Sequence, residues 1–531
     1  MSPTAHPLDP VSPQELSTAT HVVRTAHASI APLQFQAISL LEPRKAELSA
    51  WLVDRSRAPR PARVADVTVI AAEGKAYDGF VDLKSGKITK WEQLDGLQPI
   101  ITLEELQNVE EICRQDLRVI ERCRINDIPA SDMHKVYCDL WIIGHDERYG
   151  NATRRDIVLN DLRLVDKGVE RPIFYRMSLA EMVVPYGNPE HPHQRKHAFD
   201  LGGYGAVHLT NSFALGRDCK GTIHYLDADF ARHDGGVRHI KNDICLHEEA
   251  AGILFKHTDF QDDSTIVTRA RKLVVQQIFT AANYEYAIQS IFHQDGTIQP
   301  ESKLTGILNT YVMAENEDTH DWGTQVYPGV NAHNHQHLFC LRVHANIDGP
   351  HNTVFVSDTV ASDAPVGSPA NKYGNAFYAR QTKLATEGEA RTDYDGVTSR
   401  TLVSREVPGL LPKAGSLVWE RAGFARHAVH VTKYRDDELW PAGRHVPQTD
   451  GEPSSGLPAW IGDGATSIDN TDIVLWHTFG VTHIPLPEDF PIMPAETMTL
   501  LLRPRNFFAS SPAMNVRPSY CSTPEPGRPG E

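Results

Sequence analysis

Cysteine is scarce in this sequence, and long apolar runs are missing from it. Seven cysteines occur among 531 residues. Such sparse usage is typical of proteins that fold in a reducing compartment and keep their thiols free. A helix that crosses a bilayer needs roughly 18 or more consecutive apolar residues, and no stretch of the chain approaches this length. The sequence therefore predicts no transmembrane segment and no membrane partner.

An excess of positive charge is missing as well. The chain has 52 lysines and arginines against 68 acidic residues, and its formal net charge is −16. Proteins that bind nucleic acid need a basic surface to neutralise phosphates. We therefore do not expect nucleic acid to be a partner.

Targeting signals are also not recognisable. The first residues, MSPTAHPLDPVSPQEL, contain neither the basic region nor the apolar region of a secretory signal peptide. The last residues, PEPGRPGE, do not form the Ser-Lys-Leu type of peroxisomal signal. These observations favour a cytoplasmic protein.

The first hundred residues predict a small α+β domain after an N-terminal tail at residues 1–11. Ser12 and Glu15 form a capping box with Pro13 at the first helical position, so a helix should begin there. Strand-like segments follow at 36–41 and 64–70, and a turn at Lys84-Ser85-Gly86 predicts a hairpin. We place this domain at residues 12–103.

A second helix is predicted to begin at Thr102, because Glu105 completes another capping box. Four residues share one face of this predicted helix: Leu106, Val109, Cys113 and Ile120. We interpret residues 104–153 as a truncated second α+β domain.

From about Asp156 the chain predicts a large antiparallel β-sandwich. Short apolar or alternating runs are separated by Gly, Pro, Asp and Asn turns, and long helical periodicity is missing. The expected strands lie at 157–164, 207–209, 222–226, 264–268, 273–279, 303–312, 335–343 and 353–356. The predicted fold class is therefore α+β, with small N-terminal α+β domains, a sandwich at 154–511 and a flexible tail at 512–531.

Three histidines alternate along one predicted strand, at positions 333, 335 and 337. Side chains two residues apart in a strand point to the same face, so His333, His335 and His337 can converge on one ion. Imidazole suits zinc, copper, iron or nickel, and a His-x-His pair leaves room for a third ligand. His477 and His483, in VLWHTFGVTHIP, are both candidates for that ligand. The residues alone leave a metal site and ordinary surface or core histidines open.

A tyrosine-rich segment, Thr280–Tyr286, offers a second candidate for chemistry. A tyrosine in a strand is ordinarily a residue of the core or of a sheet face. Beside a redox metal it gains another role, because copper(II) and O2 can oxygenate a phenol to a quinone. A quinone is an electrophile, which no ordinary side chain supplies.

Together these motifs resemble the copper-containing amine oxidases. The pattern Thr280-x-x-Asn283-Tyr284-Glu285-Tyr286 looks like the cofactor signature of that family. Other similar segments appear in the family's order: LAEMVVPYGNP, HEEAAGILFKHTDF, RKLVVQQIFTAANYEY, LTGILNTY, YPGVNAHNHQHLF, WHTFGVTHIPLPEDFPIMP and LLRPRNFF. The likeness covers nearly all of residues 171–508 and is strongest to fungal members of the peroxisomal type, which adds the peroxisome to the expected locations.

The resemblance implies two cofactors and a set of site residues. Copper(2+) would be bound by His335, His337 and His483, which leaves His333 and His477 as neighbours. Tyr284 would be converted to topaquinone.

The resemblance also assigns roles around the cofactor. Asp200 would be the catalytic base, Tyr186 would hydrogen-bond the quinone oxygen, and Asn283 would help orient the ring. Tyr286 and Met493 match family positions near the copper and the cofactor.

Two further expectations follow from the same likeness. Ala198 stands where other members carry an aromatic gate, which implies a roomier amine channel. Cys219 and Cys245 match a disulfide of the family's catalytic domain, against the reducing compartment that the cysteine count favours.

The implied reaction converts a primary amine, O2 and water to an aldehyde, ammonia and hydrogen peroxide. The amine would form a Schiff base with the quinone, which acts as an electron sink, and Asp200 would remove the α-proton. Such a base needs a pKa raised toward neutrality by burial. The resemblance further implies a homodimer whose small-molecule partners are the amine and O2.

The chain departs from the family pattern in length. Residues 136–151 run almost directly into 154–164, where the family carries a complete third domain and the first strands of the sandwich. A second shortening falls near 398–410. Loss of sandwich strands would expose apolar edges, so the alternative function is a catalytically impaired, truncated copper-binding protein.

The family's peripheral cation site is altered too. His344 stands where relatives often have an aspartate, although Asp472 and Ile473 match other parts of that site. We therefore do not predict a second metal.

Two unrelated metal enzymes also use closely spaced histidines. A cupin places a glutamate a few residues after its His-x-His, and residues 338–342 contain none. A metallo-β-lactamase site needs an aspartate in the same run, which the sequence also lacks. Neither alternative fits the residues as well as the amine oxidases do.

Overall fold

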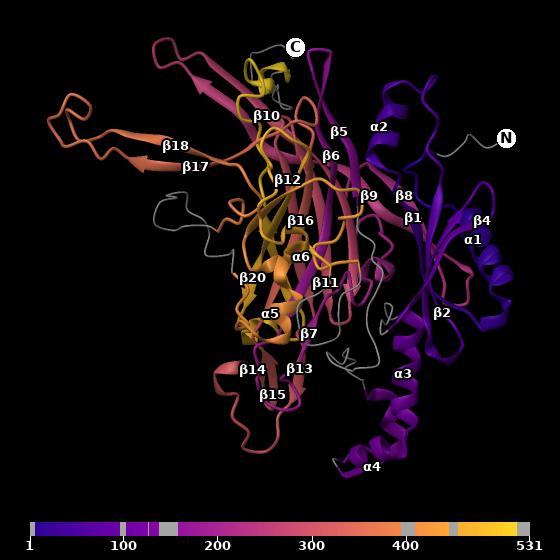
Figure 1. Ribbon diagram of the computed structural model, residues 1–531. Helices are drawn as coiled ribbons and strands as arrows, with labels where there is room; N and C mark the ends of the chain where they lie inside the picture. The colour runs from indigo at the N-terminus through magenta and orange to yellow at the C-terminus, as the bar shows by residue number, and fades with distance from the viewer. Residues whose placement is uncertain are drawn as a thin grey trace, which may run out of the picture.

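The computed structural model describes residues 6–95, 102–125, 127–136, 158–393, 409–444 and 455–517, and its larger part is a β-sandwich (Figure 1). One sheet has the strand order β21-β12-β11-β10-β9-β8. Its strands are, in that order, Met493–Thr499, Ile298–Gly306, Tyr284–His293, Thr265–Ala281, Val237–Thr258 and Ile223–Ala231. The other has the order β19-β20-β16-β6-β5, with β7 paired to β6. These strands are Val429–Lys433, Ile473–His483, His335–Ala345, Val169–Pro185 and Val158–Asp166, and β7 is His197–Ala198.

Buried apolar side chains from both sheets fill the space between them. Met182 and Phe339 of one sheet belong to the same cluster as Phe279 and Leu304 of the other. The opposite face of β16 is buried as well, against a second cluster that includes residues of α5 (Leu417–Arg421) and its neighbours. A strand covered on both faces has apolar residues at nearly every position, which explains the run LFCLRV in its centre.

The N-terminal region is the small α+β domain that the sequence predicts. A four-stranded sheet has the order β1-β2-β3-β4, with strands Gln34–Leu41, Val64–Ile70, Ala76–Asp82 and Lys87–Leu94. Helix α1 (Pro13–Ala26) packs on it through Leu16, Ala19 and Val23. The Ser12–Glu15 capping box is formed, so the predicted helix start is confirmed.

The second predicted helix is interrupted. Helix α3 (Leu103–Gln115) begins at the Thr102 capping box but ends before Asp116, and α4 (Leu117–Ile125) is a separate helix. Asp116 has an extended backbone, with φ −69° and ψ 124°, and its carboxylate accepts the Arg118 N–H at 2.8 Å. The prediction of one continuous helix through Ile120 was wrong because this local side-chain hydrogen bond competes with the helix.

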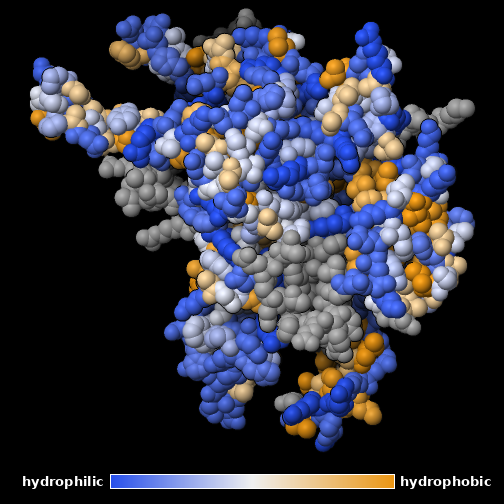
Figure 2. Space-filling model, viewed as in Figure 1, coloured by the Kyte–Doolittle hydropathy of each residue, from blue (hydrophilic) through white to orange (hydrophobic). Residues whose placement is uncertain are grey.

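Several apolar residues of α3 and α4 have no cover among the described residues. Val109, Ile112 and Leu117 are 41%, 65% and 80% exposed, and Figure 2 shows apolar surface over these helices. The shortened junction falls largely on residues 137–157, outside the described residues, as does most of the shortening near 398–410. No described helix has the length and hydropathy to cross a membrane.

The sandwich strands differ from the predicted ones in detail. Residues 207–209 lie in a 3₁₀ turn, Ala206–Leu209, and the segments 264–268 and 273–279 form one strand, β10. The remaining elements are the hairpin β17–β18 that projects from the sandwich (Figure 1), a three-stranded sheet and the short helices α2 and α6. Their bounds are Val354–Ala361, Phe377–Leu384, Thr310–Val312 (β13), Gly323–Tyr327 (β14), Val330–His333 (β15), Lys45–Val53 (α2) and Leu457–Ile461 (α6). The domain boundaries at 12–103, 104–153 and 154–511 stay predictions.

Candidate active site

Three histidines meet where β16 begins and β20 ends. His335, the first residue of β16, pairs directly with His483, the last residue of β20. His337 lies two residues further along β16 and so points to the same face as His335. The His335 ring centroid is 4.8 Å from that of His337 and 5.0 Å from that of His483. Antiparallel pairing thus joins residues that are far apart in the sequence.

The two other candidate histidines lie elsewhere. His477 pairs with Leu341, six residues along β20 from the end of the strand. His333 stacks on the ring of Tyr311, with centroids 5.0 Å apart. The strand register therefore groups His483, and not His477, with the His-x-His pair.

Burial keeps the imidazoles of His335 and His337 neutral. Desolvation, with a smaller contribution from the neighbouring His483, lowers the pKa of His335 to about 3. The pKa of His337 is also lowered far below its usual range, again mainly by burial. Neutral imidazole is the form that coordinates a metal.

The donor atoms of this group fit a bound metal. Within the described part of the chain, His337 Nε2 and His483 Nδ1 are buried without a hydrogen-bond partner, a state that an ion would relieve. His483 Nε2 lies 3.1 Å from Asp489 Oδ2, an arrangement that orients many metal-binding histidines. Among the described residues, no group of three or more His, Cys, Asp or Glu side chains is arranged to hold a metal ion, and His335 Nε2 contacts a tyrosine hydroxyl instead.

That tyrosine is Tyr284. Its hydroxyl lies 2.8 Å from His335 Nε2, and its ring centroid is 4.7 Å from that of His337. The side chain is buried, which raises the pKa of the phenol far above its usual range. The phenol that the motif singled out therefore lies directly beside the imidazoles.

A tight hairpin positions this phenol. Ala281 of β10 pairs with Tyr284 of β11, so only Ala282 and Asn283 form the turn. Asn283 Nδ2 donates to the carbonyl of Ile307 at 2.6 Å, which fastens the turn to the end of β12. Gly306, the last residue of β12, pairs with Tyr284 of β11 and has φ +109°; a Cβ there would come within 2.7 Å of the Asn283 carbonyl oxygen. Only glycine fits this position.

Asp200 lies beside the hydroxyl of Tyr286, in the turn after β7. Tyr286 Oη donates to Asp200 Oδ2 at 3.5 Å and lies 3.0 Å from His337 Nδ1. Burial, and to a smaller extent the negative charge of Glu181, raise the pKa of Asp200 to about 7, although the Tyr286 hydrogen bond acts in the opposite direction. A carboxylate poised near neutrality is suited to general-base catalysis.

Glu181 was not found by sequence analysis. This residue of β6 is fully buried, and its Oε1 accepts the N–H of Met182 at 3.0 Å and that of Gly202 at 3.2 Å. The second bond holds the turn that carries Asp200. A signal was present, because Glu181 is the only charged residue in the run LAEMVVPYG.

We expect Glu181→Gln to lower the pKa of Asp200. Glutamine keeps an oxygen for the Gly202 N–H but removes the like charge that disfavours ionisation of Asp200. The acidic limb of the pH–rate profile should then move to lower pH by about one unit, which steady-state oxidation rates across pH would measure. Glu249→Gln, in the half-exposed outer part of β9, is the control and should leave the limb in place. If the acidic limb of Glu181→Gln stays at the same pH or moves to higher pH, the charge of Glu181 does not raise the pKa of Asp200 and this assignment is refuted.

The structure also places three further residues that the sequence analysis named, Tyr186, Met493 and Ala198. Tyr186 follows β6, forms a bridge with His335 and stacks on its imidazole with centroids 5.1 Å apart. Met493 is buried and pairs with Gly306 of β12, which in turn pairs with Tyr284. Ala198 is buried in β7, two residues before the carboxylate.

The expected disulfide is not formed in the structure. Cys219 and Cys245 are free thiols in one buried cluster with Phe213. The Cys219 sulfur lies 3.2 Å from the hydroxyl of Tyr225. Burial and the nearby Cys219 raise the pKa of Cys245 to about 12, so its reactive thiolate is scarce.

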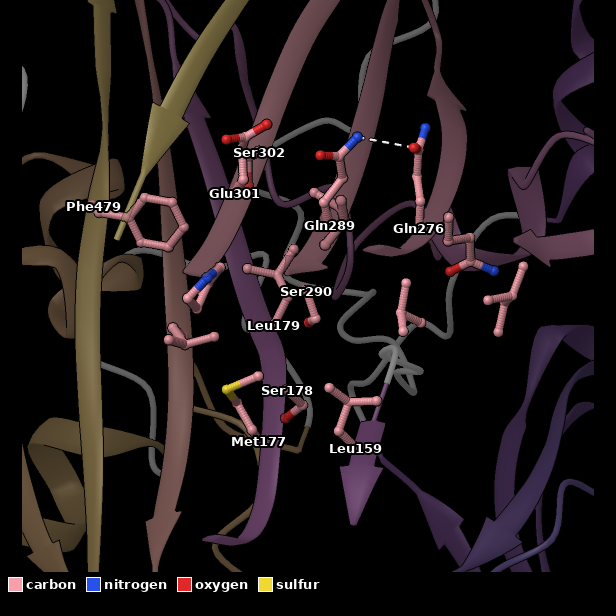
Figure 3. A pocket seen from close by; sticks show the side chains of 16 residues that line it. Leu159, Met177, Ser178, Leu179, Gln276, Gln289, Ser290, Glu301, Ser302 and Phe479 are labelled. Carbon is pink, nitrogen blue, oxygen red and sulfur yellow. Dashed lines mark hydrogen bonds between the residues drawn. The ribbon is translucent and has the colours of Figure 1, made fainter. Parts of the chain in front are cut away.

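A small cavity between the sheets is separate from this site (Figure 3). Its volume is about 30 Å³, enough for about one or two water molecules. Polar side chains line part of it, and Gln289 Nε2 donates to Gln276 Oε1 at 2.9 Å. Neither Asp200 nor Tyr284 lines this cavity, so we do not assign the substrate to it.

Comparison with known families agrees with this geometry. The family described as "Copper amine oxidase, enzyme domain" matches residues 144–406 and 400–523. The N2 and N3 domains of copper amine oxidases match residues 6–94 and 104–167. The chain belongs to the copper amine oxidase family. The resemblance and the α+β fold class are thereby confirmed, and copper and topaquinone are the cofactors of this family of enzymes.

Fungal copper amine oxidases are similar over almost the whole chain. "Copper amine oxidase 1" of Schizosaccharomyces pombe is 44% identical over 97% of this chain and 90% of its own. "Peroxisomal primary amine oxidase" of Pichia angusta is 41% identical over 96% of this chain and 92% of its own. A crystal structure of a copper-containing benzylamine oxidase from Hansenula polymorpha superposes with a TM-score of 0.85 at 27% identity, covering 97% of this chain and 100% of that one.

The comparison with the fission yeast relative also bears on length. That alignment spans 641 positions, whereas this amine oxidase has 531 residues. The additional positions are residues of the relative that have no counterpart here. This chain is therefore shorter than the fission yeast relative within the aligned region.

Proposed function

We propose that this chain is a primary-amine oxidase that uses O2 and water to form an aldehyde, ammonia and hydrogen peroxide. The observation that carries the proposal is the 2.8 Å contact between the Tyr284 hydroxyl and His335 Nε2 inside a buried group of three imidazoles. We assign copper to His335, His337 and His483, and topaquinone to Tyr284. When bound, copper with O2 supplies the oxidising power that converts the phenol, and the quinone supplies an electrophilic carbonyl for the amine.

Asp200 is assigned as the general base. Its carboxylate is buried, so water does not compete for it, and its pKa of about 7 allows it to accept a proton near neutral pH. The proton comes from the carbon atom next to the amine nitrogen. Tyr286 joins this carboxylate to His337 by hydrogen bonds, which fixes the base relative to the metal site.

Three other residues are assigned positioning roles. Asn283 hydrogen-bonds the turn before Tyr284 to the end of β12, and Tyr186 stacks on His335. Met493 pairs with Gly306, which in turn pairs with Tyr284. We further propose a homodimer, and a location in the cytoplasm or in peroxisomes, since the Pichia angusta relative is named peroxisomal.

Two observations favour a second candidate function. The chain is shorter than the fission yeast protein, and apolar residues of α3 and α4 are exposed. Both fit a protein that has kept the copper ligands but no longer oxidises amines. Such a protein would bind copper at the same histidines without forming the quinone.

Reconstitution separates these two functions. Protein prepared without copper should gain a phenylhydrazine-reactive chromophore and benzylamine-dependent hydrogen peroxide formation only after copper(II) is added in air. Addition of copper under nitrogen is the control, because the phenol needs O2 for its conversion. Copper uptake in air without a hydrazine adduct would support the non-enzymatic candidate and contradict amine oxidation.

A further inference from the structure

The ammonium group of Lys45 is enclosed by polar and aromatic groups of the sandwich. Lys45 is the first residue of α2, in the N-terminal domain. Its Nζ donates to both carboxylate oxygens of Asp472, at 2.6 and 2.7 Å, and lies 2.8 Å from His344 Nε2. The ring centroids of Tyr175 and Tyr434 lie 4.9 and 5.1 Å from it. Only 12% of the lysine side chain is exposed.

These groups come from separate strands of one sheet. Tyr175 belongs to β6 and His344 to β16, whereas Asp472 precedes β20 and Tyr434 follows β19. Four neighbouring strands and the residues next to them therefore contribute one group each to the surroundings of Lys45.

A further aspartate holds these surroundings in place. The Asp436 carboxylate accepts the backbone N–H of Lys45 at 3.0 Å and the hydroxyl of Tyr434 at 2.8 Å. It thus fixes the start of α2 and one aromatic ring at the same time. The Tyr434 ring and the backbone of Lys45 are therefore held by Asp436 and not only by contacts of the lysine side chain.

The chemistry of the enclosure suits a primary ammonium ion. Burial lowers the pKa of Lys45, and Asp472 partly reverses that effect. Two aromatic faces stabilise a cation without supplying lone pairs. A calcium ion needs six to eight oxygen ligands, whereas one carboxylate, one imidazole and two rings match an N–H donor. Burial lowers the pKa of His344 to about 4, so the imidazole adds no charge.

We propose that these residues form an ammonium-binding site, which Lys45 occupies as an intramolecular ligand and through which the N-terminal domain is fastened to the catalytic sheet. The ligand class is a primary alkylammonium ion. A tethered lysine has a high effective concentration at such a site, so free amines do not displace it. This site is independent of the proposed amine oxidation.

Other contacts keep α2 in place when the lysine is shortened. Arg176 forms an ion pair with Glu42 at 2.8 Å, and Leu48 and Trp51 of α2 are buried against Tyr175. The enclosure should therefore persist as a vacant site in Lys45→Ala.

Chemical rescue tests the proposal. Lys45→Ala removes three methylene groups and the ammonium, which n-propylammonium replaces. The experiment uses the full chain in a Tyr284→Phe background, so that the amine is not oxidised. We expect a lower melting temperature for Lys45→Ala, and a dose-dependent recovery with n-propylammonium chloride on the order of 2 °C. Sodium chloride and n-propanol should give no such recovery.

Two variants sharpen the test. Lys45→Met keeps most of the side-chain volume without the charge, so it should also melt lower but should not respond to n-propylammonium. Lys383→Ala breaks an exposed ion pair with Asp469 and should not respond either. Equal responses of Lys45→Ala and Lys45→Met, or no response of Lys45→Ala beyond that to sodium chloride, would overturn the proposal.

Discussion

Replacing Tyr284 with phenylalanine should abolish amine oxidation and the phenylhydrazine adduct while copper binding persists. The variant lacks the phenol oxygen that lies beside His335, so no quinone can form. The ring itself is retained, and loss of its hydrogen bond should cost about 1 kcal/mol of folding stability. Copper content by atomic absorption, hydrazine titration and hydrogen peroxide formation would be measured on the same preparation.

A matched control is available in the N-terminal sheet. The Tyr77 hydroxyl donates to Gln93 at 3.2 Å, and Tyr77→Phe should keep both chromophore and activity. Amine oxidation retained in Tyr284→Phe would refute the cofactor assignment. Loss of copper together with activity would show instead that the phenol is needed to build the metal site.

Asp200→Asn should have the second-largest effect. An amide cannot take up the proton that the carboxylate accepts, and general-base catalysis contributes about 10²- to 10⁴-fold to a rate. We expect turnover to fall by about that factor, while the hydrazine adduct still forms because Tyr284 is unchanged. Asp243→Asn is the matched control, because Asp243 is another buried aspartate with a raised pKa, and its turnover should stay near that of the parent protein.

The parent protein should also show the titration of this base. Asp200 acts when it has lost its proton, and its pKa is raised to about 7. Below this value the deprotonated fraction falls about tenfold per pH unit, so the rate should rise with pH and level off above neutrality. A rate that is independent of pH between pH 5 and 8 would contradict the assignment of Asp200 as the base. The same profile is the reference for Glu181→Gln.

Sequence patterns predicted the grouping of the three histidines only in part. Alternation along a strand places His335 and His337 on one face, but it cannot choose between His477 and His483. The choice depends on the register of β16 against β20, which is a long-range property. Only the resemblance to a family supplied it from the sequence.

Local sequence signals predicted where the helices at Ser12 and Thr102 begin, but not where the second of them ends. The capping boxes at Ser12 and Thr102 both form, because they depend on residues three positions apart. The break at Asp116 was missed, since the apolar spacing continues across it. Glu181 was missed because its partner, Gly202, is brought near by the turn after β7.

The cysteines illustrate a limit of carrying over a family feature. Cys219 and Cys245 share a cluster, as the resemblance implies, but they remain thiols in the structure. The position of the two residues was therefore predicted correctly and their covalent state was not. The low cysteine count had pointed to free thiols.

Strand β16 is covered on both of its faces and hydrogen-bonded on both of its edges. A strand held in this way has little freedom to shift, so the spacing between His335 and the phenol is set by the rigid interior and not by a mobile loop. A protein that modifies one of its own residues does so once, without a second enzyme to align the groups. Folding alone would then place the phenol and the imidazoles in the positions that this single modification of Tyr284 requires.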